Sequence, residues 1–247
     1  MGELGAPLPE LQSIQGMDHT NDDQAFGILE WMMQQFGQSF PPDKIDQFRQ
    51  LFDEAKKVED SPWATDKDYQ DPAVATMAQR ISYACNPPVP SFTLRMVCSA
   101  VCGGSLTLKQ MFLALLQCAG EHPGLLTIQD RSDWALHFIC GGAVEATIGL
   151  GQATGAFKEW TDSFDGGDVD PNDYAATFCG ARFVQLAAED PSWLSSWADG
   201  SRILATSLPS LTFTETDDER KSGIFTPETI NKIVASVNAA YATTKEE

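Results

Sequence analysis

The apolar residues of this chain recur at intervals of three and four residues over most of its length, which is the period of an α-helix. In residues 43–57, for example, Ile45, Phe48 and Phe52 fall on one helical face, and charged side chains occupy the opposite face. Only residues 125–128 and 211–214 resemble strands, and both segments are too short to build a sheet. The pattern therefore predicts an all-α protein of about nine helices.

Prolines, glycines and capping residues divide this pattern into separate helices. Helices are expected to begin near residues 22, 42, 72, 91, 107, 132, 172, 191 and 227. The segment 86–90 contains three prolines and cannot continue a helix, so it is expected to act as a hinge between two lobes. We predict four parts around an apolar central region, namely an N-terminal arm with the first helix (1–40), an N-terminal lobe (41–86), a C-terminal lobe (91–222) and a closing helix with a tail (223–247).

Charge is distributed unevenly along the chain. The protein has 35 acidic and 16 basic residues and a formal net charge of −19. The excess lies in residues 1–75 and 158–247, whereas residues 76–157 carry equal numbers of acidic and basic side chains. A neutral, apolar middle between two acidic ends indicates that the middle is buried and that the ends face water or a basic partner.

Several functional classes lack support in the sequence. No apolar run reaches the roughly 20 residues that a membrane span needs, so no membrane partner is expected. Nucleophile-elbow and phosphate-loop motifs are absent, so we predict neither an enzyme nor a cofactor. Cys98 and Cys102 are four residues apart, but nothing nearby completes a metal site, and no metal is predicted. His137 lies among apolar residues and is expected in the core.

Four local patterns are informative together. They are Phe40-Pro-Pro-Asp-Lys-Ile45 with Trp63-Ala-Thr-Asp66, Thr93-Leu-Arg95-Met-Val97, Ser163-Phe-Asp-Gly166 with Asp170-Pro171, and Gly223-Ile-Phe-Thr-Pro227 before the last helix. These patterns resemble the nucleoproteins of phlebovirus-type segmented RNA viruses, which are themselves similar to the coat proteins of flexuous filamentous plant viruses. The total length agrees with that family as well. Together the patterns cover about a third of the chain.

The resemblance implies a self-assembling nucleocapsid or coat protein that encapsidates single-stranded RNA without sequence specificity. It also implies a homo-oligomer in which a terminal arm docks on the neighbouring subunit. The apolar stripe expected to serve as this oligomerisation arm is Phe26, Leu29, Met33 and Phe36. Such a protein would work in the host cell cytoplasm and in the virion.

Encapsidation also requires basic side chains that neutralise phosphates. The neutral middle of the chain supplies four, and these are the residues predicted to bind RNA: Arg80, Arg95, Lys109 and Arg131. Two alternatives stay open. The chain is either an acidic helical interaction or regulatory protein that engages a basic protein partner through its ends, or a helical enzyme or carrier with an apolar pocket beside the glycine-rich residues 141–155.

Overall fold

The computed structural model describes Trp63, residues 66–84, 90–152, 154–155 and 171–200, and positions 235, 237 and 239. Within these ranges the chain forms six helices and no strand, which confirms the all-α class for this part. The predicted arm, the helix expected near residue 42, the prolines of the hinge before Pro90 and most of the closing helix lie outside the described residues. The total of nine helices and the two lobes therefore stay predictions.

The first two described helices both begin at a proline. Helix α3 spans Pro72–Ala84 and helix α4 spans Pro90–Cys102. Proline is favoured at the first helical position because its fixed φ suits the helix and its missing N–H would have no partner there. For this reason α4 starts at Pro90, slightly before the start expected near residue 91.

Side-chain caps fix the starts of two further helices. Helix α5, Leu108–Glu121, opens with a capping box in which the Thr107 hydroxyl accepts from the Gln110 N–H at 3.2 Å and the Thr107 N–H donates to Gln110 Oε1 at 2.9 Å. Helix α9, Pro191–Ala198, is capped by Asp190, whose carboxylate accepts from the Ser192 N–H at 2.9 Å. Both starts match the sequence prediction.

Helices α6 and α8 form the centre of the described part. Helix α6 spans Ser132–Ile148 and helix α8 spans Pro171–Glu189. A tight turn precedes α6, with Gln129 and Asp130 at φ 51° and 64°, and Ile128 forms a single bridge to Arg131. The helix begins at Ser132, as expected from the sequence, and Arg131 occupies the capping position without a side-chain cap bond.

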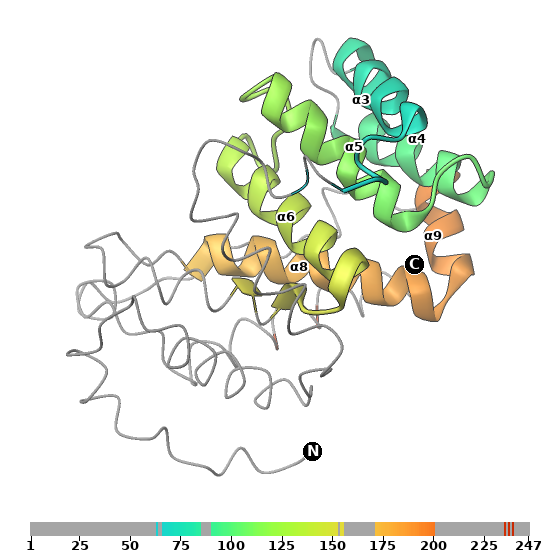
Figure 1. The fold of residues 1–247 in the computed structure, drawn as a ribbon. Coiled ribbons are helices and arrows are strands. Elements are labelled where there is room, and N and C mark those ends of the chain that lie inside the picture. Colours follow the sequence, from blue (N-terminus) through green and yellow to red (C-terminus); the bar gives the residue numbers. More distant parts are fainter. Residues whose placement is uncertain are drawn as a thin grey trace.

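The helices pack in a continuous series (Figure 1). Helix α3 lies on α5, α5 on α6, α6 on α8, α8 on α9, and α9 on α4. An aromatic cluster joins four of these helices, with ring centroids between 4.7 and 6.0 Å apart in its closest pairs. Its members are Phe112, Phe138, Phe183, Trp193 and Trp197. The cluster is buried, so it forms the centre of the core.

Glycines bring α6 and α8 unusually close. A methyl group built on Gly180 would lie 1.9 Å from the carbonyl oxygen of Phe138, and one built on Gly141 would lie 2.1 Å from that of Thr177. In both cases the obstacle is backbone, which cannot move aside as a flexible side chain can. Gly141 belongs to the glycine-rich residues 141–155, and α6 and α8 make the most extensive helix pair of the described residues.

Candidate functional site

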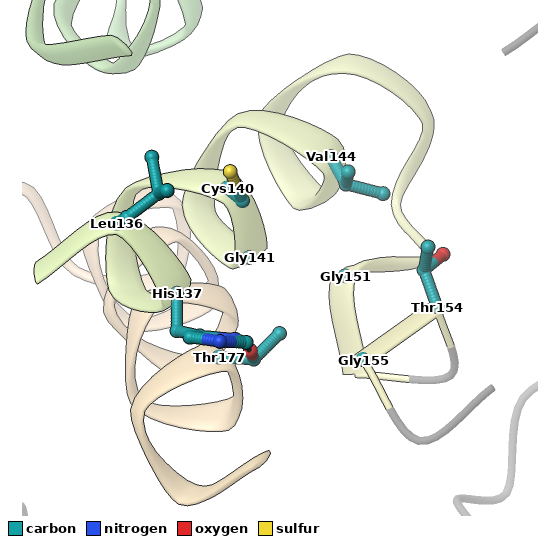
Figure 2. Close-up of a pocket in the computed structure, with 9 residues that line it drawn as sticks. All are labelled: Leu136, His137, Cys140, Gly141, Val144, Gly151, Thr154, Gly155 and Thr177. Carbon is teal, nitrogen blue, oxygen red and sulfur yellow. Dashed lines mark hydrogen bonds between the residues drawn. The ribbon is translucent and has the colours of Figure 1, made fainter. Parts of the chain in front are cut away.

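A partly open pocket lies along the seam between α6 and α8 (Figure 2). Its volume is about 160 Å³. Helix α6 contributes one wall, which includes Leu136, Cys140 and Val144, and α8 contributes Thr177. The opposite wall comes from the short segment that follows α6, through Gly151, Thr154 and Gly155. The pocket therefore belongs to the glycine-rich region that the sequence singled out.

The segment after α6 reaches this seam because the chain reverses at Gly149. This residue ends α6 in the left-handed region, at φ 74°, where glycine is favoured. The Glu145 side chain then accepts from the N–H of Gly151 at 2.8 Å and fixes the next turn against α6. Gln185 on α8 donates to the other carboxylate oxygen of Glu145 at 3.0 Å. These bonds tie the pocket's second wall to both helices.

His137 connects the two helices at the floor of the pocket. Its Nε2 lies 3.2 Å from Asp173 Oδ2, and its Nδ1 lies 3.2 Å from Thr177 Oγ1. The Thr177 hydroxyl also lies 3.0 Å from the carbonyl oxygen of Asp173, one turn back on α8. The sequence predicted a core histidine among apolar neighbours. The structure gives it polar partners from α8 as well and leaves 14% of its side chain exposed.

The polar groups that line the pocket have partners within the chain. Imidazole nitrogens of His137 face Asp173 and Thr177, and the hydroxyl of Thr154 donates to the Leu150 carbonyl at 2.8 Å. The Thr177 methyl group faces Gly155, since a methyl built on that glycine would lie 2.4 Å from Thr177 Cγ2. The pocket therefore offers mainly apolar surface to an incoming group.

The four basic residues predicted to bind RNA come from four separate elements. Arg80 lies on α3, Arg95 on α4, Lys109 on α5, and Arg131 in the turn before α6. Three of them have partners within the chain. Arg95 donates from Nε to the carbonyl of Ala198 at 3.2 Å, where it satisfies the C-terminal end of α9.

Lys109 and Arg131 are held by carboxylates. Lys109 Nζ lies 2.7 Å from Asp66 and 3.1 Å from Asp68. Burial lowers the pKa of Lys109, but the hydrogen bonds and charges of these two aspartates outweigh burial and raise it overall. Arg131 pairs with Asp133, and its guanidinium lies 4.6 Å from the ring centroid of Trp134. The arginine also lowers the pKa of Asp133.

Arg80 is exposed, and the structure places an exposed tyrosine beside it that sequence reasoning did not select. Tyr83, three residues further along α3, is 78% exposed. Residues three apart on a helix are neighbours on its surface. The spacing was visible in the sequence, but the exposure of the ring was not, because a tyrosine at this position fits a buried face as well.

The oligomerisation-arm residues Phe26, Leu29, Met33 and Phe36 lie outside the described residues. Among the helices that the structure describes, none is both long and apolar enough to cross a bilayer. No three His, Cys, Asp or Glu side chains in the described ranges gather into a group able to hold a metal ion. Comparisons with protein families, with curated proteins and with solved structures find no match to this chain.

Proposed function

We propose that the protein is a self-assembling nucleocapsid or coat protein that covers single-stranded RNA without reading its sequence. Two observations support this proposal, namely the four local resemblances to phlebovirus-type nucleoproteins and the apolar pocket between α6 and α8. The pocket carries the argument, because a subunit that polymerises through an exchanged helix needs a receptor for apolar side chains on its body.

The size and chemistry of the pocket suit a single apolar anchor. An engineered protein cavity of about 150 Å³ that is lined by apolar side chains binds benzene. The pocket here, at about 160 Å³, thus has room for the end of one Phe, Leu or Met side chain. Leu136, which also lines the pocket, is 45% exposed and would be covered by the helix that carries this anchor. Anchors of this kind dominate the energy of many interfaces.

The donor in this proposal is the N-terminal arm of a neighbouring copy. Its predicted apolar stripe, Phe26, Leu29, Met33 and Phe36, has the helical spacing that a groove-binding helix requires. Exchange of the arm from subunit to subunit would give a chain or ring of two-lobed, roughly nine-helix subunits. The protein would then act in the cytoplasm of a host cell.

RNA in this proposal is held by a few cations and not by a strongly basic groove. Arg80 is exposed on α3, whereas Lys109 and Arg131 already pair with aspartates, so a phosphate would have to compete with Asp66, Asp68 and Asp133. These internal pairs favour a second candidate function. An acidic protein whose middle is internally neutralised would bind a basic protein partner through its acidic ends.

Size-exclusion chromatography with light scattering and dual-wavelength ultraviolet absorbance separates these candidates. A nucleocapsid or coat protein elutes as a high-mass species with excess nucleic-acid absorbance. Ribonuclease treatment should remove that absorbance and should shorten the assemblies if RNA holds them together. A discrete low-mass species with a pure protein spectrum, both before and after addition of single-stranded RNA, would overturn the proposal and favour the acidic interaction protein.

A further inference from the structure

The outward face of α3 differs in charge from most of this acidic protein. The helix buries Val74, Met77 and Ile81, which leaves the opposite side in contact with water. Arg80 is the one charged residue in the helix, and no acidic side chain accompanies it. The exposed positions beyond the first proline are Ala73, Ala75, Thr76, Gln79, Arg80 and Tyr83.

Arg80 and Tyr83 stand out on this face because the fold leaves both of them available. In the described part of the chain, neither has a hydrogen bond or an ion pair, in contrast to Arg95, Lys109 and Arg131. Tyr83 leaves 78% of its surface in water, the largest exposure of any large hydrophobic side chain among the described residues. At a spacing of three residues, the guanidinium and the phenol ring can reach adjacent parts of one ligand.

We infer that Arg80 and Tyr83 together form a contact site for single-stranded RNA, in which Arg80 pairs with a backbone phosphate and Tyr83 stacks on a neighbouring base. A cation that follows the backbone and an aromatic ring that stacks on a base are the two elements of sequence-independent recognition of single strands. Every base has a π-face, so this pair accepts any sequence. The small residues Ala73, Ala75 and Thr76 on the same face leave room for the strand to pass along α3.

This inference rests on the proposed function, since it assigns the RNA contact of the same protein. The sequence predicted four RNA-binding cations without ranking them, and this inference selects one of the four. Arg95 satisfies the end of α9, and Lys109 and Arg131 are neutralised by aspartates. Arg80 is the member of that set with a free guanidinium in the described part of the chain and with an aromatic partner for a base.

The test measures the affinity of the full-length protein for a labelled short oligouridine. Fluorescence anisotropy gives this affinity over a range of salt concentrations. Replacement Tyr83→Ala is expected to weaken binding roughly 5- to 150-fold, because one stacked base is lost, whereas Tyr83→Phe should bind as the wild type does. Arg80→Gln should lower the slope of log affinity against log salt by about 0.7, the value for one phosphate contact on a single strand. Gln79→Ala, on the same face, is the matched control.

The outcomes distinguish a failure of the α3 site from a failure of the proposed function. If the wild-type protein binds no RNA, the proposed function fails, and this inference fails with it. If the wild type binds and Tyr83→Ala binds equally well, the α3 site is wrong while the proposed function stands. A change in assembly mass without a change in RNA affinity would likewise overturn the inference, since it would assign the α3 face to a protein contact. Circular dichroism of each variant verifies the fold.

Discussion

At the residue scale, Lys109 was predicted from the sequence to bind RNA, but in the structure it forms ion pairs that connect two segments of the chain. Its ammonium group bridges Asp66 and Asp68, which precede α3, and its own helix is α5. The amide of Gln110 next to it donates to Asp71 at 3.1 Å. The start of α5 thereby holds the turn that leads into α3. Because the Lys109 ammonium is already paired with aspartates, it is less available to bind a phosphate of RNA.

Replacement of Lys109 by methionine tests this role. The variant keeps most of the aliphatic stem but leaves two aspartates without their cation. We expect the free energy of unfolding to fall by about 0.5–1 kcal/mol near neutral pH, the upper range for partly exposed ion pairs. Urea denaturation of both proteins measures the difference, and added salt should reduce it because salt screens the pair.

The difference in free energy of unfolding between the wild type and Lys109→Met should depend on pH if it comes from the ion pair, and should not if it comes from packing. Burial raises the pKa of Asp66, but the hydrogen bond from Lys109 and backbone hydrogen bonds outweigh burial and hold it below its ordinary value of 3.8. A lowered carboxyl pKa contributes stability above the ordinary value, and that stability is lost as the pH falls through the folded-state pKa. The wild-type advantage should therefore shrink between about pH 7 and pH 3. An equal advantage at both pH values would show that the ion pair of Lys109 with Asp66 is not its source.

At the element scale, the contact between α6 and α8 depends on the absence of side chains at a few positions. Gly180→Ala would place a methyl group 1.9 Å from the Phe138 carbonyl oxygen, so the two helices would have to move apart. We expect a loss of about 1–3 kcal/mol or more in the free energy of unfolding, as for other overpacked cores. Thermal or urea unfolding provides the measurement.

Gly120→Ala is the matched control for this prediction. Gly120 also lies in a helix, α5, but a methyl group built on it meets nothing within 4 Å. Alanine is favoured over glycine inside helices, so this variant should be more stable by up to about 1 kcal/mol. A similar destabilisation in both variants would show that the close approach of α6 and α8 is not what makes Gly180→Ala unfavourable.

The described helices were largely predictable because their ends carry local signals. Pro72, Thr107 and Pro191 mark helix starts through interactions within a few residues, and the sequence located all three. The start of α6 at Ser132 was located as well, but the preceding turn, with Gln129 and Asp130 at positive φ, has no strong sequence signature.

The candidate site was less predictable, because it depends on contacts between distant segments. One alternative placed an apolar pocket beside the glycine-rich residues 141–155, yet the helix that forms the other side of that pocket could not be read from one segment. The links from His137 to Asp173 and Thr177 join residues about forty positions apart. Likewise, the ion pair of Lys109 with Asp66 depends on how α5 packs beside the start of α3.

At the scale of the whole molecule, assembly has to overcome the net charge of −19 that each subunit carries. Like charges oppose association at low salt, and a local apolar contact is therefore needed to hold neighbouring copies together. Under the proposed function, the pocket between α6 and α8 supplies that contact. Raising the salt concentration should strengthen assembly through screening while it weakens RNA binding.

Replacement of Leu136 by glutamate tests the pocket as the receptor for a neighbouring arm. The side chain is already 45% exposed, so the substitution should disturb the folded subunit little, but an arm docked over it would bury an unpaired carboxylate. Light scattering should then show a shift from high-mass assemblies toward single subunits, and Met33→Asp in the arm should do the same. Gln79→Ala, at an exposed position on α3, is the control expected to keep the wild-type mass. If Leu136→Glu assembles normally while Met33→Asp does not, the arm docks elsewhere on the subunit; if both assemble normally, exchange of this arm is not how the protein polymerises.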